Sequence, residues 1–171
     1  MNVNVLTVVT AVLTGLLLNA CSENPEEQVR QAQATIAAVD GTRIEAANRE
    51  PGEWMAHGRT YSEERFSPLS HIDDGNVNEL ALAWSMDLET NRALEATPII
   101  VDGVMYTTGS WSIVYAVDAQ TGALIWKYDP EVPREWAINA CCDAVNRGAT
   151  VWEGKVFAGT IDGRLIALNA E

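Results

Sequence analysis

The stretch VDGVMYTTGSWSIVYAVDA (residues 101–119) recurs with changes as WEGKVFAGTIDGRLIALNA (residues 152–170), and the two align without a gap at a spacing of 51 residues. Each combines short apolar runs with Asp-Gly or Glu-Gly pairs, which is typical of β-hairpins. A strand-rich unit that repeats after about 40 to 50 residues is typical of a β-propeller blade. The sequence therefore predicts an all-β protein with a β-propeller fold; the alternative is two similar hairpins by chance.

A second pattern predicts how neighbouring blades meet. In AVDAQTGALIW (residues 116–126), Thr121-Gly122 predicts a tight turn, and Ala116 leaves room for a ring to pack over its strand. Trp126 supplies a large flat face that can pack against the next blade. We therefore interpret Trp126 as a structural residue.

An earlier stretch has the same character. LAWSMD (residues 82–87) resembles LIWKYD (residues 124–129), with Trp84 in the place of Trp126. We therefore expect a strand at 82–87 and a structural role for Trp84.

The second repeat stops where the first continues. Glu171 corresponds to Gln120, which the turn Thr121-Gly122 follows in the first repeat. A propeller blade cannot bury its faces alone, and a closed ring needs several blades. We expect about two blades over residues 54–171, truncated from a larger propeller.

The N-terminus has the composition of an export signal. Residues 1–20 contain no charged side chain, and their apolar run of 14 residues is short for a membrane span. Leu18 and Ala20 before Cys21 resemble a bacterial lipobox, in which the cysteine is lipidated. The alternative is ordinary cleavage after Ala20, with Cys21 there by chance.

Residues 21–53 form a polar segment before the blades. Pro25, with glutamates after it, predicts a short helix at 25–38, and a weaker helix is expected at 42–49. The same composition also suits a tether that lifts the propeller off a membrane.

Composition excludes one class of partner. The chain carries 24 acidic and 11 basic side chains, a net charge of −13. Nucleic acid binding requires a basic face, so no nucleic acid partner is expected. Because 47% of the residues are hydrophobic, the chain has ample material for a folded core.

Four stretches in order resemble one enzyme family. They are WMAHGRTYSEERFSPLSHI (54–72), LEATPIIVDGVMY (94–106), the tryptophan motif and CCDAVNRG (141–148). Over about residues 40–171 the sequence resembles the alcohol dehydrogenases that depend on pyrroloquinoline quinone (PQQ). The resemblance implies an eight-bladed propeller in the periplasm.

The resemblance assigns the adjacent cysteines to the cofactor. It implies that Cys141 and Cys142 form a disulfide stacked on one face of PQQ. Adjacent Cα atoms lie closer than in ordinary disulfides, so such a ring would be strained, rigid and flat. Two buried free thiols or a redox switch are the alternatives.

Two charged residues are assigned in the same way. Arg147 matches the family arginine that contacts the acidic edge of PQQ, and a guanidinium can hold a carboxylate through two hydrogen bonds. Glu95 matches a glutamate that hydrogen-bonds the cofactor. The alternatives are a surface ion pair for Arg147 and a solvated acid at a blade end for Glu95.

Other polar residues near these are given no chemistry. Asp143, Asn146 and Gly148 are interpreted as turn residues that shape the loop, with Gly148 permitting close backbone approach. His57 and His71 show no metal-ligand spacing with the cysteines.

No catalytic base or metal ligand is assigned within the chain. The family's calcium ligands and its aspartate base are expected beyond residue 171, and no C-x-x-C-H haem motif is present. By itself this piece is therefore expected to be inactive.

Two functions follow from the resemblance and the repeats. The first is an exported, periplasmic dehydrogenase that oxidises a small alcohol by hydride transfer to PQQ and passes electrons to a cytochrome c. The second is a non-catalytic propeller lipoprotein, anchored through Cys21, that scaffolds envelope protein assembly. A scaffold has no need of the cysteine pair with Arg147 and Glu95, which favours the enzyme.

Overall fold

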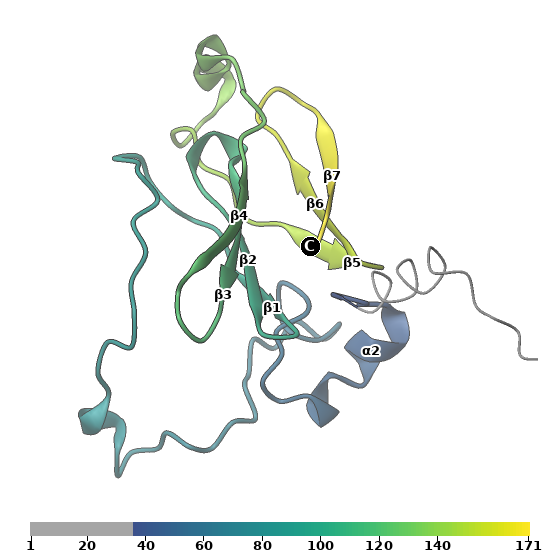
Figure 1. Ribbon diagram of the computed structural model, residues 1–171, viewed down its shortest axis with the longest axis vertical. Coiled ribbons are helices and arrows are strands. Elements are labelled where there is room, and N and C mark those ends of the chain that lie inside the picture. Colours follow the sequence, from purple (N-terminus) through teal and green to yellow (C-terminus); the bar gives the residue numbers. More distant parts are fainter. Residues whose placement is uncertain (1–35) are drawn as a thin grey trace, which may run out of the picture.

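The strands form two antiparallel sheets in the structure, a computed structural model that describes residues 36–171 (Figure 1). The strand order is β1-β2-β3-β4 in the first sheet and β5-β6-β7 in the second. The strands are β1 (Ile99–Val101), β2 (Val104–Thr108), β3 (Val114–Asp118), β4 (Leu124–Tyr128), β5 (Thr150–Trp152), β6 (Lys155–Gly159) and β7 (Leu165–Asn169). Within residues 36–171, the helices are α2 (Gly41–Glu45) and four short 3₁₀ helices, η1 (Ala47–Arg49), η2 (Val77–Glu79), η3 (Ser110–Ser112) and η4 (Arg134–Asn139).

The two sheets repeat one another. Strands β5, β6 and β7 begin and end 51 residues after β1, β2 and β3. The pairing register is also shared, because Tyr106 pairs with Ala116 in the first sheet and Phe157 pairs with Ala167 in the second. The gap-free sequence alignment therefore matches equivalent strands, which confirms the predicted β-repeat.

Residues with positive φ close the tight hairpins. Asp102 and Gly103 have φ angles of 53° and 80°, and Glu153 and Gly154 have φ angles of 46° and 74°. Two consecutive positive φ values are typical of the type I′ turn, whose twist matches that of the flanking strands. The Asp-Gly and Glu-Gly pairs therefore form the turns that the sequence predicts.

Trp126 joins the two sheets. The half-buried indole donates a hydrogen bond from Nε1 to the Ala170 carbonyl oxygen at 3.1 Å. Tyr106 donates to the same carbonyl at 3.0 Å, and its ring lies 6.1 Å from the Trp126 ring. The aromatic pair thus spans the space between the first sheet and the end of the second, as predicted for Trp126.

Trp84 makes the equivalent contact one unit earlier. Its Nε1 donates to the Ala119 carbonyl oxygen at 3.1 Å, and Ala119 corresponds to Ala170 in the repeat. A Cβ atom on Gly122 would lie 2.5 Å from the Trp84 ring, so only a glycine at this turn leaves enough space for the indole. The structural role predicted for Trp84 is therefore confirmed.

The strand predicted around Trp84 is not formed. Residues 82–87 form no ladder with any strand within residues 36–171, and Leu82 is 81% exposed. An isolated extended segment has no partner for its backbone N–H and C=O groups, so apolar pattern alone does not make it a strand.

A short helix lies where the weaker helical pattern predicts one. Asp40 caps α2, because its side chain accepts a hydrogen bond from the Arg43 backbone N–H at 2.7 Å. The 3₁₀ helix η1 follows and ends at Arg49, before Pro51. These two elements correspond to the helix predicted at 42–49.

The other N-terminal predictions fall mainly on residues outside the described range. Residues 36–38 are not helical, so the predicted helix 25–38 does not reach its predicted end. Its remaining residues, the signal segment 1–20 and Cys21 lie outside the described residues. No helix within residues 36–171 is long and apolar enough to cross a membrane.

The described part of the N-terminal segment packs against both sheets. The Val39 carbonyl accepts a hydrogen bond from the Glu153 backbone N–H at 2.9 Å, and the Glu53 side chain accepts one from the Asp102 backbone N–H, in the β1-β2 turn, at 2.9 Å. Burial of apolar side chains removes this segment from solvent, so from residue 36 it is part of the packed structure and not a free tether. Its buried core residues are Ala37, Val39, Ile44 and Ala47.

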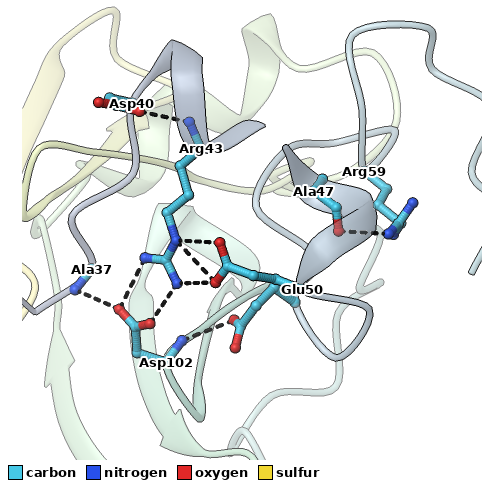
Figure 2. A network of polar contacts seen from close by, with 8 residues as sticks. Ala37, Asp40, Arg43, Ala47, Glu50, Arg59 and Asp102 are labelled. Carbon is cyan, nitrogen blue, oxygen red and sulfur yellow. Dashed lines mark hydrogen bonds and ion pairs between the residues drawn. The ribbon is translucent and has the colours of Figure 1, made fainter. Parts of the chain in front are cut away.

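Arg43 fixes α2 to the first hairpin (Figure 2). Its guanidinium contacts Glu50 at 2.7 Å and Asp102, in the β1-β2 turn, at 2.6 Å. The side-chain hydrogen bonds with Glu50 and then Asp102 raise the pKa of Arg43. Asp102 also accepts from the Ala37 backbone N–H at 3.1 Å, so one turn residue anchors two parts of the segment.

Candidate functional site

The CCDAVNRG stretch forms the connection from η4 to β5 and so joins the two sheets. Cys141 and Cys142 are exposed on it as thiols, with their sulfur atoms 2.7 Å apart. The pKa of the Cys142 thiol is raised, first by its hydrogen bond with Cys141. The two side chains thus lie together as predicted, and the disulfide between them stays a prediction.

Glu95 and Arg147 lie beside each other and near the cysteines. Arg147 Nε lies 3.6 Å from Glu95 Oε2. The negative charge of Glu95 raises the pKa of Cys142 further, and the positive charge of Arg147 lowers it. The four predicted site residues, from two segments far apart in the sequence, therefore occupy one region.

Backbone contact between the two segments explains this meeting. The Thr97 backbone N–H donates to the Arg147 carbonyl at 3.2 Å, and Thr97 forms an isolated parallel bridge with Gly148. Gly148 has φ of 131°, and a Cβ atom there would lie 3.0 Å from the Thr97 carbonyl oxygen. Only glycine fits this conformation and this approach easily, as predicted.

Asn146 holds the loop in place through all its hydrogen-bonding positions. Its Oδ1 accepts from Thr108 Oγ1 at 2.9 Å and from the Gly148 backbone N–H at 3.0 Å. Its Nδ2 donates to Ser112 Oγ at 3.0 Å and to the Gly159 carbonyl at 2.7 Å. Thr108 and Gly159 are equivalent ends of β2 and β6, so Asn146 connects the two repeats directly before Arg147.

Arg92 is a residue of this region that the sequence does not reveal. Its Nη1 lies 2.6 Å from Asp143 Oδ1, directly after the cysteines. The pKa of Asp143 is lowered by hydrogen bonds from the backbone N–H of Ala144, then Arg92, then the backbone N–H of Ala93. Arg92 and Asp143 lie 51 positions apart in the sequence, so no local sequence pattern predicts that they form a pair.

One open hollow lies at the loop itself, and another lies beside Arg92. One of about 470 Å³ is lined in part by His57, Arg147 and Thr160, and so includes a histidine that we interpret from sequence as an ordinary polar residue. The other, of about 460 Å³, is lined in part by Arg92 and Trp111. Within residues 36–171, no group of three acidic, histidine or cysteine side chains is arranged to hold a metal ion.

The arrangement can bind a flat anionic molecule. The Arg147 side chain is 77% exposed, and its 3.6 Å contact with Glu95 is long for an ion pair. The guanidinium can therefore donate hydrogen bonds to a carboxylate of a ligand. The exposed sulfur pair beside it offers a polarisable surface to a planar ring. A planar molecule with carboxylates at its edge fits both features.

Comparison with known proteins identifies the fold. The family model for the β-propeller domain of PQQ glucose/ethanol/alcohol dehydrogenases matches residues 54–171. Quinohemoprotein alcohol dehydrogenase ADH-IIG of Pseudomonas putida is 62% identical over 135 residues, which cover 79% of this chain and 19% of that protein. The dehydrogenase subunit of a quinone alcohol dehydrogenase from Komagataeibacter europaeus is 56% identical over 144 residues, covering 81% and 20%.

Solved structures agree. The structure of ADHIIG from Pseudomonas putida matches with a TM-score of 0.77 and 62% identity, over 79% of this chain and 20% of that one. Quinohemoprotein alcohol dehydrogenase from Comamonas testosteroni matches with a TM-score of 0.76 and 50% identity, over 84% and 22%. The chain spans about a fifth of the length of these relatives. With its repeated sheets and these matches, the chain belongs to the PQQ-dependent alcohol dehydrogenase family and has its β-propeller fold.

Proposed function

We propose that a protein as long as these relatives, with this chain as its N-terminal part, oxidises an alcohol with PQQ as cofactor. The observation that carries the proposal is the meeting of Glu95, Arg147 and the two cysteines at one exposed loop. Three of these four residues lie in CCDAVNRG, and the fourth reaches them through the Thr97 contact.

Arg147 is proposed to hold a carboxylate of PQQ. Its exposed guanidinium can form two parallel hydrogen bonds with such a group. Glu95 lies next to it and orients the same edge of the cofactor by hydrogen bonding. Because the chain as a whole carries a charge of −13, a local arginine is needed to make this region attractive to an anion.

The cysteine pair is proposed to form the floor of the site. Their exposed sulfur atoms face solvent beside the charged pair, where a planar ring can stack on them. In an oxidising compartment the two thiols are proposed to form a disulfide, which would fix this surface. The contribution of the chain is thus binding and orientation.

The redox step belongs to the cofactor. When bound, PQQ supplies the group that accepts the hydride from the alcohol. The calcium ligands and the base expected for the family are assigned to positions after residue 171. The residues described here would hold PQQ at one face and one edge and keep that face from water.

Export and electron transfer complete the proposal. The uncharged segment 1–20 supports export to the periplasm, and the lipobox-like LLNAC supports a lipid anchor on Cys21. A relative 58% identical over 119 residues, from Thauera butanivorans, is named 1-butanol dehydrogenase (cytochrome c). A periplasmic cytochrome c is accordingly the proposed electron acceptor.

The experiment that tests the function is reconstitution of the full-length apoprotein. Adding PQQ and calcium is expected to produce alcohol-dependent reduction of cytochrome c, with no reduction when PQQ is omitted. The same mixture without alcohol is the control. A full-length protein that folds and is loaded with calcium but neither binds PQQ nor oxidises any of a series of primary alcohols would support the scaffold instead.

A further inference from the structure

The four proposed cofactor residues come from two loops that must keep a fixed relation. Glu95 belongs to the segment before β1, and the cysteines and Arg147 belong to the segment before β5. The Thr97 contact joins the segments at the Arg147 end. The contacts of Thr97 and Glu95 all lie at the Arg147 end of the second loop, so a link at the cysteine end must come from other residues.

Asp143 makes that second connection with both carboxylate oxygens. Oδ1 lies 2.6 Å from Arg92 Nη1, and Oδ2 accepts a hydrogen bond from the Ala93 backbone N–H at 3.4 Å. Arg92 and Ala93 lie three and two residues before Glu95, respectively, and Asp143 directly follows Cys142. One side chain therefore links the two loops next to the residues proposed to bind the cofactor.

Both partners are held in their orientation by other contacts. Asp143 has φ of 78°, a conformation that a non-glycine residue adopts rarely, and it forms an isolated bridge with Cys141. The Arg92 guanidinium lies 5.8 Å from the centre of the Trp111 ring, within the range of cation–π attraction. The Trp111 backbone N–H in turn donates a hydrogen bond to the Ala144 carbonyl at 2.8 Å, and Ala144 lies on the same loop as the cysteines.

We propose that Asp143 is a positioning residue for the PQQ site, which sets the distance between Glu95 and the cysteine pair by holding Arg92 and Ala93. The inference rests on the proposed function, since it concerns the same site. Asp143 itself contacts no cofactor atom in this account. It acts through the loop that carries Glu95.

The pair is expected to affect binding more than stability. The Arg92 and Asp143 side chains are 48% and 28% exposed, and ion pairs exposed to this degree contribute little to the free energy of unfolding. Residues that orient a binding group have larger effects on ligand affinity, because small displacements of the group weaken its contacts. Loss of the link should therefore weaken PQQ binding with the fold intact.

The test measures PQQ binding to full-length apoprotein by the change in absorbance of the bound quinone, in a double-mutant cycle. Asp143→Asn and Arg92→Gln are each expected to raise the Kd for PQQ about tenfold, the lower limit for a residue that orients a binding group, and the double variant no further. Arg92→Lys, which keeps the charge, is expected to stay within about threefold of wild type. Glu89→Gln is the control. Glu89 lies on the same loop as Arg92 and forms an exposed ion pair with Lys127, so its replacement removes an ion pair and leaves Asp143 unchanged.

The outcomes separate this inference from the proposed function. Wild-type affinity in Asp143→Asn and Arg92→Gln, together with a loss of affinity in Arg147→Ala, would overturn the positioning role alone. Unchanged affinity in all three variants would overturn the proposed site as well. The inference would also be overturned if the losses of PQQ affinity at positions 92 and 143 were additive and accompanied by a lower melting temperature. Asp143 would then contribute to general stability.

Discussion

Replacing Trp126 with alanine in the full-length protein is expected to lower the free energy of unfolding by about 3 kcal/mol, near the lower limit for deleting an aromatic side chain from a core. The change removes the packing against Tyr106 and the hydrogen bond to the Ala170 carbonyl, which together join the first sheet to the second. Urea denaturation followed by circular dichroism measures the effect. The value lies near the lower limit because Trp126 is only half-buried.

Trp136 provides the matched control. It lies in η4 and is 40% exposed, and its replacement by alanine should change the free energy of unfolding by less than about 1 kcal/mol. Equal losses for the two tryptophans would contradict a specific role of Trp126 between sheets. Because Trp84 makes the same contact with Ala119, Trp84→Ala should resemble Trp126→Ala rather than the control.

Replacing Arg147 with alanine is expected to weaken PQQ binding by the full-length protein about 30-fold to 100-fold. A charge-assisted hydrogen bond to a carboxylate contributes about 1.5 to 3 kcal/mol, and a bidentate pair lies in the upper part of that range. Arg147→Lys should recover part of the affinity, because lysine keeps the charge but not the planar pair of donors. Equilibrium titration of apoprotein with PQQ gives the three Kd values.

Arg49→Ala controls for the loss of a positive charge. Arg49 is exposed in η1, which contributes none of the four proposed site residues, and its replacement should leave PQQ affinity unchanged. A loss of similar size in Arg49→Ala and Arg147→Ala would mean that net charge, and not a contact at the loop, determines binding.

The repeat determines how much of the fold can be predicted from the sequence. Strands β1 to β3 and β5 to β7 follow from apolar runs between turn residues, and the spacing of 51 residues places them in equivalent units. Turn chemistry is local, so Gly103 and Gly154 mark the hairpins reliably.

Predictions that depend on partners are less secure. Residues 82–87 have the composition of a strand but lack a neighbouring strand within residues 36–171. The polar composition of the N-terminal segment suits a tether, yet Val39 and Ile44 are buried in the hydrophobic core. A few apolar residues at the right positions are enough to anchor such a segment. The average composition of the segment does not show where these residues lie.

Some residues of the candidate site can be predicted from the sequence, and others are found only in the structure. Cys141, Cys142 and Arg147 lie in one short motif, so the sequence can propose them together. That Glu95 reaches Arg147 depends on the bridge between Thr97 and Gly148, which only the structure shows. Arg92 could not be predicted, because a single exposed arginine is ordinary in any surface loop.

The central claim is that the loop around Cys141 and Cys142 forms one face of the PQQ site. A crystal structure of the full-length protein with PQQ tests it most directly. We expect electron density for the quinone ring stacked on the two sulfur atoms, with a PQQ carboxylate within hydrogen-bonding distance of the Arg147 guanidinium. Density for PQQ at another place, with the cysteine pair and Arg147 facing only solvent, would contradict it.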